Sequence, residues 1–508
     1  MKIDFGMLCD NMPLKIEPVG IAASGINLPN TLYFPFLVKG DVKKNQYVCV
    51  NAPSGRLIGM VVEIASSNRY YEKMEGVSDF SINSDLTSAL PAKDWEYATA
   101  MAKVLGVLGE KGIYRSDFPV SPGSEVFVPE EAELERFLGF VKDGLEIGAL
   151  ANSQTAARID MDRLFGKHLA ILAMSGAGKS HLAAVLIEEM LLRPQELGRM
   201  GLVVFDLHGE YASFAHGDFA KQVRIVNGEE VKIPFASLRA TLIHKWYPEM
   251  TSKGIMTLSE NLAAVQKSEG GLKDLVRNII AGNAKPNIKD ALVPYLQSLD
   301  RMNIISGEGS PKMQDFSKPG VLNVFDMSKI TSEKKRQMIV QFYTSRIFNF
   351  VKAKKLPPTL IMIEEAHNFA PEKARKGTAV AKASVEKIAR EGRKFGCCLC
   401  LISQRPVHMS VTALSQCNSN IILRVTNPND LGHIGTSCEG IDESMLKSIT
   451  TLRTGDAILV GEAVNFPTFL KIRARKTHSP KSSGFLTGLA LKFEEGKKKR
   501  ATDVEAYL

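Results

Sequence analysis

Residues 171–181, ILAMSGAGKSH, hold the clearest chemical signal in the sequence. An apolar strand pattern leads into a loop of small residues that ends in Lys179 and Ser180, and an apolar helix pattern follows. The loop fits the phosphate-binding pattern G-x-x-x-x-G-K-[ST], with Ala173 in place of the first glycine. Such a loop points backbone N–H groups at an anion, and the helix adds the positive end of its dipole. We therefore expect ATP to bind here, with Lys179 on the β- and γ-phosphates and Ser180 on Mg²⁺.

The whole loop is expected to line the phosphates. The predicted nucleotide-binding residues are Ser175, Gly176, Ala177, Gly178, Lys179, Ser180 and His181. The alternative is an ordinary strand-to-helix turn with a chance lysine. A strand pattern before the loop and a helix pattern after it favour the phosphate loop.

A pair of carboxylates follows a second apolar run. In TLIMIEEAH, residues 359–367, four apolar residues predict a buried strand that delivers Glu364 and Glu365 to its carboxyl end, where open parallel sheets bind ligands. We expect Glu364 to hold a magnesium-bound water and Glu365 to orient or deprotonate the attacking water. A second carboxylate favours an ATPase over a small-molecule kinase. His367 is expected to begin the next helix or to contact a neighbour, without a chemical role.

Two further strand patterns end in polar residues. Gln404 directly follows the strand pattern LIS in LISQRP. It is predicted to contact the γ-phosphate or the attacking water. Asp206, His208 and Glu210 follow the strand in VVFDLHGEY. Asp206 and Glu210 are expected to support the magnesium or the water indirectly, through the groups that contact them.

A basic segment spans residues 371–394. Its loop residues are candidates for contact with DNA phosphates: Lys373, Arg375 and Lys376. Arg390 or Arg393, on the helix pattern that follows, is a candidate to reach the γ-phosphate of an adjacent subunit, where such arginines accelerate phosphoryl transfer by roughly 10³- to 10⁵-fold. The alternative for the segment is a solvated helix face.

These motifs need a scaffold that brings strand ends together. From about residue 150 strand and helix patterns alternate, which is typical of an α/β fold with a parallel sheet covered on both faces. We expect residues 146–475 to form this core and residues 235–318, which carry helix patterns and no good strand, to be a helical insertion. The pattern of residues 1–145 predicts the short strands of a small β-barrel. Residues 476–508 form a basic tail.

Composition sets broad limits on the protein. The 508 residues exceed one ordinary domain, and 44% hydrophobic with 23% charged residues is typical of a folded soluble protein. The net charge of +9 weakly favours an acidic partner such as nucleic acid. No apolar run approaches a membrane span and no signal peptide is evident, so we expect no membrane partner. The clustered cysteines of GCCLCLIS lack metal-ligand spacing, which favours reduced thiols and a cytoplasmic location.

Five ordered motifs, AMSGAGKSH, FDLHGEY, IEEAHNF, AREGRKFG and SQRP, resemble the HerA group of the HerA–FtsK DNA-pumping ATPases. The resemblance implies a RecA-like P-loop core, an N-terminal HAS-type barrel, an inserted helical bundle and a C-terminal brace. It implies a homohexameric ring around double-stranded DNA that works with a NurA-type nuclease in DNA end resection. It assigns hydrolysis to Lys179, Glu365 and Gln404, and the arginine acting in trans to Arg390.

The sequence departs from that family at three places. Ala173 replaces the usual first glycine, and Leu207 stands where proline is usual. Lys167 occupies the position of an arginine that acts in cis, so it is a nucleotide-binding candidate. Lysine keeps the charge of arginine and loses its planar fork, which puts a transition-state role for Lys167 in doubt.

Three other interpretations stay open. A secretion or conjugation ATPase has a related core and prefers a membrane-docked partner. A regulatory nucleotide-binding module would not need the carboxylate of Glu365. A HerA-like ring serving an antiviral effector is not distinguished by this sequence.

Overall fold

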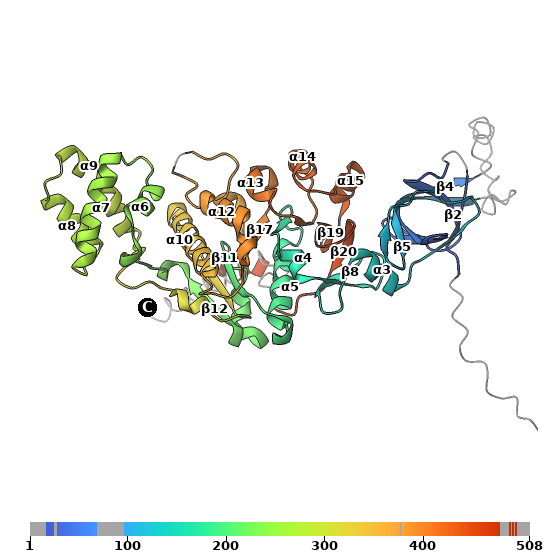
Figure 1. Cartoon of the computed structure of the whole chain (residues 1–508), viewed down its shortest axis with the longest axis horizontal. Coiled ribbons are helices and arrows are strands. Elements are labelled where there is room, and N and C mark those ends of the chain that lie inside the picture. Colours follow the sequence, from blue (N-terminus) through green and yellow to red (C-terminus); the bar gives the residue numbers. More distant parts are fainter. Residues whose placement is uncertain are drawn as a thin grey trace, which may run out of the picture. The chain divides into compact units, whose positions relative to one another are not determined.

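The computed structural model describes residues 17–24, 28–68, 96–375 and 377–477, together with residues 487, 488, 490, 491, 493 and 494. The chain divides into two compact units, whose helices and strands are labelled in Figure 1. Residues 1–164 and 438–472 form unit 1, and residues 165–437 and 473–508 form unit 2. Residues 438–472 thus lie with the N-terminal part of the chain, although we predicted them as part of the core.

The N-terminal part of unit 1 is an antiparallel barrel, as predicted. Its strands run in the order β2 (Tyr33–Val38), β1 (Gly20–Ala22), β7 (Glu125–Phe127), β3 (Tyr47–Ala52), β4 (Gly55–Asn68), β5 (Glu96–Gly109) and β6 (Gly112–Tyr114). Pairing of β2 with β5 closes the barrel. Its interior is apolar because alternate side chains of each strand point inward, and Phe34, Phe36 and Val126 are fully buried there.

The rest of unit 1 is a second antiparallel layer. Two hairpins meet where β20 pairs with β8. The elements are α3 (Glu131–Leu138), β8 (Leu145–Leu150), β9 (Ala156–Ile159), α15 (Glu443–Thr451), β19 (Asp456–Gly461) and β20 (Thr468–Ile472). Asp442 caps α15 by accepting the backbone N–H of Met445 at 2.9 Å, and Lys103 of the barrel donates to the same carboxylate at 2.5 Å.

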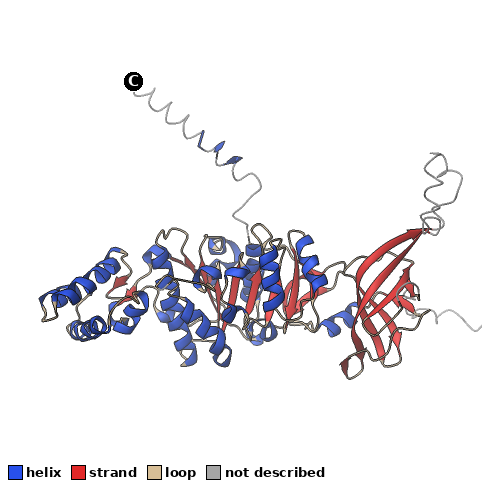
Figure 2. Ribbon diagram, turned by 90° about the horizontal axis from the view of Figure 1, so that it is seen from above, coloured by secondary structure: helices blue, strands red, loops and turns tan. Residues whose placement is uncertain are grey.

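Unit 2 is built on a parallel sheet of seven strands. Their order is β12 (Val223–Asn227), β15 (Leu322–Asp326), β11 (Gly201–Asp206), β16 (Thr359–Ile363), β17 (Cys397–Ser403), β10 (Leu169–Leu172) and β18 (Ser419–Ile422). All residues of β10, β11, β16, β17 and β18 are buried, as expected for a parallel sheet covered on both faces. Figure 2 shows helices on both sides of these strands. The predicted α/β class is confirmed.

The covering helices include a long one and the helix that follows the phosphate loop. The bounds are α5 (Lys179–Leu192), α10 (Glu333–Lys352), α11 (Ala366–Phe369), α12 (Lys382–Glu391), α13 (Val411–Leu414) and α14 (Pro428–Ser437). The short helix α4 (Met161–Phe165) lies almost entirely in unit 1. The clustered cysteines lie on β17 and are buried free thiols, which agrees with the predicted reduced state.

Four helices lie between the short strands β13 (Ile233–Pro234) and β14 (Ile305–Ser306), in the segment predicted as a helical insertion. They are α6 (Ala240–Trp246), α7 (Ser252–Lys267), α8 (Leu272–Ala281) and α9 (Pro286–Arg301). Leu272, Leu275 and Ile279 of α8 are buried, whereas Ile280 is exposed. Within the described part of the chain, no helix is long and apolar enough to cross a membrane.

Candidate functional site

The register of the parallel sheet brings four strand ends to one edge. Ile363 of β16 lies opposite Phe205 of β11 and Leu401 of β17, and Ser403 lies opposite Leu172 of β10. The residues that follow these strands therefore meet at the carboxyl edge, where ligands bind in open parallel sheets. The phosphate loop, the Glu364–Glu365 pair, Gln404 and the loop that begins after Asp206 all follow these four strands.

The phosphate loop joins β10 to α5. Gly176 (φ 77°) and Gly178 (φ 105°) adopt the left-handed region that favours glycine. Gly178 is also the N-cap of α5 and has no side chain to occupy the first N–H groups of the helix, so these groups stay available for an anion. Ala173 lies outside the left-handed region and is buried, which explains why alanine can replace the first glycine.

Lys179, Glu365 and Gln404 come together although they lie on three separate segments. The Lys179 ammonium forms an ion pair with Glu365 Oε1, and both side chains are almost completely buried. The Gln404 amide donates to the same oxygen, with its Nε2 at 2.5 Å. The residues predicted for hydrolysis are therefore in direct contact in the structure.

Glu365 has an unusual backbone. Its φ of 44° and ψ of 48° lie in the left-handed region, which is rare for a residue with a Cβ and costs on the order of 1–3 kcal/mol. Burial tends to raise the pKa of Glu365, but Lys179 and Gln404 outweigh it and hold this pKa below its ordinary value. The carboxylate is thus ionised and strained into position, as a proton acceptor at neutral pH requires.

Glu364 is in a different environment from its neighbour. Its side chain is fully buried, and the Tyr211 hydroxyl donates to its Oε1 at 2.8 Å. Burial, followed by the nearby Asp206, raises the pKa of Glu364 to about 8. Its Oε2 is buried without a hydrogen-bond partner, which leaves one carboxylate oxygen for a ligand.

Asp206 shapes the loop that supports Glu364. Its carboxylate accepts the backbone N–H groups of His208 (3.0 Å), Gly209 (2.8 Å) and Tyr211 (3.0 Å). Burial nevertheless raises the pKa of Asp206. Because the folded loop places the Tyr211 hydroxyl on Glu364, Asp206 acts on the site through this loop, and Glu210 lies half-buried beside it.

His367 contacts the site, although no chemical role was expected for it. Its Nδ1 lies 3.0 Å from Ser403 Oγ and 3.4 Å from Glu365 Oε2. Burial lowers the pKa of His367, and the carboxylate of Glu365 opposes this effect. The signal for this contact was its position two residues after Glu365, within the single turn of α11.

The remaining predicted residues lie farther from this group. His181 Nε2 is 2.8 Å from the carbonyl oxygen of Arg473, so its ring is engaged with the C-terminal segment. Lys167 precedes β10 at the amino edge of the sheet, and four strand residues, about 13 Å at ~3.3 Å each, separate it from the phosphate loop. Arg390 lies in the last turn of α12, which precedes β17 at that same edge. The structure does not bring Lys167 or Arg390 to the phosphate loop of their own chain.

The candidate DNA contacts are exposed. Lys373 and Arg375 lie in the loop before α12. Lys376 lies outside the described residues. The arrangement leaves the two described cations accessible to a phosphate backbone.

The donor set fits one magnesium ion shared with a nucleotide. No group of three or more His, Cys, Asp or Glu side chains that could hold a metal exists among the described residues. Mg²⁺ typically takes one or two protein ligands and completes its shell with water and substrate phosphates. Ser180 in the first turn of α5 and the unpartnered Oε2 of Glu364 match that requirement.

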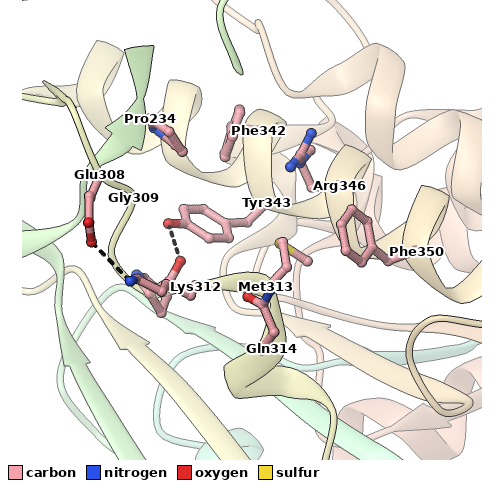
Figure 3. A pocket seen from close by; sticks show the side chains of 11 residues that line it. Pro234, Glu308, Gly309, Lys312, Met313, Gln314, Phe342, Tyr343, Arg346 and Phe350 are labelled. Carbon is pink, nitrogen blue, oxygen red and sulfur yellow. Dashed lines mark hydrogen bonds and ion pairs between the residues drawn. The ribbon is translucent and has the colours of Figure 1, made fainter. Parts of the chain in front are cut away.

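Two cavities differ in their relation to this site. One of about 810 Å³ is lined by Arg405, which directly follows Gln404, and by Asn427 and His433. Another, of about 240 Å³, lies where the chain returns from the inserted helices to α10 (Figure 3). Arg346 stacks there on Phe350, 5.2 Å from the ring centroid. No residue predicted for catalysis or nucleotide binding lines either cavity, and the site is located by the contacts at the carboxyl edge of the sheet.

The parallel sheet and phosphate loop define a P-loop ATPase fold. Two solved structures share it, and both are similar in fold alone. VirB4 of Thermoanaerobacter pseudethanolicus has a TM-score of 0.54 and 17% identity, with 66% of this chain and 98% of that chain covered. The plasmid coupling protein TrwB in complex with the GTP analogue GDPNP has a TM-score of 0.50 and 14% identity, with 70% and 95% covered.

Comparison of sequences identifies a narrower group of proteins than comparison of folds. The family model for the central domain of helicase HerA matches residues 145–347. A protein of Methanocaldococcus jannaschii named "Probable helicase" is 28% identical, over 87% of this chain and 94% of its own length. The DNA double-strand break repair helicases HerA of Sulfurisphaera tokodaii (26%; 93% and 95% covered) and Pyrococcus furiosus (27%; 74% and 78% covered) are also similar. The match to the family model and the similarity to these relatives support membership of the HerA family.

Proposed function

We propose that the protein is an ATP-driven translocase or helicase of double-stranded DNA. It acts as a homohexameric ring and works with a NurA-type nuclease in DNA end resection and double-strand break repair. The contact of Lys179, Glu365 and Gln404 beside an open phosphate loop carries this proposal. Support for the DNA substrate comes from the names of the HerA relatives, which cover most of this chain.

Nucleotide binding changes the partner of Lys179. The first N–H groups of α5 and the loop backbone hold the phosphates, and the Lys179 ammonium moves from Glu365 to the β- and γ-phosphates. Glu365 Oε1 is then left with Gln404 and is available to a water molecule. Nucleotide binding thereby makes Glu365 available as the general base.

Hydrolysis follows from the freed carboxylate. Glu365 accepts one proton of the attacking water as the water oxygen bonds to the γ-phosphorus, and the bond to the bridging oxygen breaks to give ADP and inorganic phosphate. Ser180 and Glu364 would hold Mg²⁺, which neutralises charge on the phosphates. Gln404 keeps Glu365 oriented, and Arg390 of an adjacent subunit stabilises the transition state.

Glu365→Gln tests this assignment. The substitution keeps the shape of the side chain and removes its basicity, so ATP should bind with near wild-type affinity while kcat falls by about 10²- to 10⁴-fold. Calorimetry with ATP and a phosphate-release assay measure the two effects. Lys179→Ala is the matched comparison and should lose binding as well as turnover. Wild-type turnover in the Glu365→Gln protein would exclude Glu365 as the base.

The ring is tested separately from the chemistry. Electron microscopy of the Glu365→Gln protein with ATP and duplex DNA should show six-fold particles with DNA in the channel. A protein that turns over ATP at full speed as a monomer would contradict the translocase.

A further inference from the structure

A histidine without a role in the proposed hydrolysis lies at the oxygen of Glu365 that Gln404 does not contact. Gln404 donates to Oε1, whereas Nδ1 of His367 lies 3.4 Å from Oε2. The same Nδ1 lies 3.0 Å from the hydroxyl of Ser403, the last residue of β17. Because Ser403 directly precedes Gln404, two adjacent residues reach both oxygens of one carboxylate, one of them directly and the other through the imidazole.

Ser403 is held by the backbone on two sides. Its Oγ accepts the backbone N–H of Arg405 at 3.0 Å. Its carbonyl oxygen accepts the backbone N–H of Ala173, at the start of the phosphate loop, at 3.2 Å. The residue is fully buried and lies opposite Leu172 in the sheet. The hydroxyl is therefore a fixed point to which an imidazole can bind.

The backbone of His367 is fixed as well. His367 lies in the single turn of α11, where the carbonyl oxygen of Asn368 accepts the side-chain amide of Gln337, in α10, at 2.6 Å. Gln337 is 1% exposed, which shields the donor from water. The direction of the imidazole ring is then the main freedom left to His367, and the contact with Ser403 determines it.

The surroundings of the imidazole determine which nitrogen carries the proton. Burial lowers the pKa of His367 against the opposing effect of Glu365, so the ring is neutral near pH 7 and carries one N–H. A carboxylate oxygen only accepts hydrogen bonds, and Ser403 Oγ has a second lone pair besides the one that Arg405 uses. The N–H therefore belongs on Nδ1, where both oxygens can accept it.

This contact becomes more important when nucleotide binds. The proposed movement of the Lys179 ammonium to the phosphates removes one partner of Glu365. Gln404 alone then holds Oε1, and a carboxylate that is held at one oxygen can still rotate about its terminal C–C bond. A second donor at Oε2 prevents this rotation. Hydrogen bonds of catalytic groups are often long without substrate and shorten in the reacting complex, which fits the present 3.4 Å.

We propose that His367 is a positioning residue for the general base: held by Ser403, its Nδ1–H fixes Oε2 of Glu365 so that Oε1 stays directed at the attacking water. The inference rests on the proposed ATP hydrolysis and adds to it a residue that touches neither nucleotide nor water. It predicts a loss of kcat without a loss of ATP affinity, because the phosphate loop and Lys179 hold the phosphates.

Two substitutions of similar size test the donor. His367→Asn places an amide nitrogen near the position of Nδ1, whereas His367→Leu keeps the bulk of the side chain and offers no donor. Misplacement of a catalytic group by about 1 Å can cost roughly 10²-fold in rate, so kcat should fall about 10- to 100-fold in His367→Leu and less than about 3-fold in His367→Asn. Calorimetry with ATP should give wild-type affinity for both, which also shows that they fold. Equal losses of kcat, or no loss in either variant, would overturn the positioning role.

Ser403→Ala tests the anchor, because it removes the hydroxyl and leaves the imidazole in place. The loss of one hydrogen bond should lower kcat by about 3- to 10-fold. If His367 acts through Ser403, the double variant with His367→Leu should have the same kcat as His367→Leu alone. Losses that multiply would show that the two residues act independently and would refute the anchor.

The Glu365→Gln background separates two failures. His367→Leu should lower the residual turnover of Glu365→Gln by less than about 2-fold, since the base through which it acts is already absent. A further loss of about 10-fold would give His367 a role apart from Glu365, which would overturn this inference and leave the ATPase standing. Wild-type turnover in Glu365→Gln itself would instead contradict the proposed hydrolysis.

Discussion

At the scale of single residues, the environment assigns different roles to two adjacent glutamates. Glu364 is buried beside Asp206 and Tyr211, whereas Glu365 faces Lys179 and Gln404. The pKa of Glu364 is therefore raised to about 8, and that of Glu365 is lowered. The left-handed backbone at Glu365 separates the two carboxylates, which is why neighbours in sequence meet different partners.

His168, which is buried directly before β10, predicts an acid sensitivity of folding. The backbone N–H of Leu399, in β17, donates to its Nδ1 at 3.0 Å. Burial lowers the pKa of His168 to about 4, whereas an unfolded histidine titrates near 6.5. Between these pH values the unfolded chain binds a proton that the native protein does not, so stability falls as pH drops from about 6.5 to 4. The full difference corresponds to roughly 3 kcal/mol.

Thermal unfolding at pH 7 and pH 5 measures this effect. The melting temperature of the wild-type protein should fall further between the two pH values than that of His168→Asn, which has no imidazole to protonate. Equal decreases would show that His168 titrates normally in the folded protein.

At the scale of elements, the ordered motifs predicted which strand ends meet. Parallel strands share an edge, so the residues after β10, β16 and β17 had to converge, and Lys179, Glu365 and Gln404 were predicted from their types and their places in the motifs at these strand ends. The contacts of His367 and His168 were not predictable, because each depends on the register between strands and on the left-handed backbone at Glu365 or His168. Local sequence patterns specify neither the register between strands nor a left-handed backbone at these two residues.

Segment 473–477 is attached to α5 by one buried carboxylate. Glu188 Oε1 accepts the backbone N–H groups of Lys476 and Thr477, each at 2.8 Å, and Arg473 donates to Oε2 at 2.8 Å. Burial tends to raise the pKa of Glu188, and these hydrogen bonds outweigh it and lower the pKa. The helix that begins at the phosphate loop thus holds the start of the C-terminal segment.

Glu188→Ala should release this segment. Breaking a buried ion pair by removing one partner typically costs about 3–5 kcal/mol. We expect the amides of Lys476 and Thr477 to exchange with deuterium at least 10-fold faster, since their acceptor is removed. Glu189→Ala is the matched control, because Glu189 pairs with Arg473 at 2.8 Å and accepts neither amide. Equal exchange in the two variants would refute the role of Glu188.

At the scale of the whole molecule, charge and assembly should govern the proposed contact with DNA. In the proposed ring the net charge of +9 would be multiplied, and the described loop cations Lys373 and Arg375 are exposed. Binding through phosphates releases counterions, so it weakens steeply with salt. The proposed channel should therefore make DNA-stimulated turnover sensitive to ionic strength.

Removing the loop cations should make DNA binding less sensitive to salt. Lys373→Ala with Arg375→Ala should weaken duplex binding and lower the slope of log affinity against log salt concentration by about 1 for each phosphate that is no longer neutralised. Fluorescence anisotropy with labelled duplex DNA at several salt concentrations measures the slope. Lys273→Ala with Arg277→Ala, on exposed positions of α8, is the charge-matched control. An unchanged slope in the first variant would place the DNA elsewhere.

The pairing of β8 with β20 has a consequence for synthesis of the chain. Leu150 lies opposite Leu470, and 320 residues separate them in sequence. At roughly 5–20 residues per second, the ribosome finishes β8 about 15–65 s before its partner strand exists. During that interval one edge of β8 stays unpaired, which makes the nascent protein dependent on chaperones or on prompt completion. A chain whose synthesis stops before β20 would be prone to aggregation even if its barrel is folded.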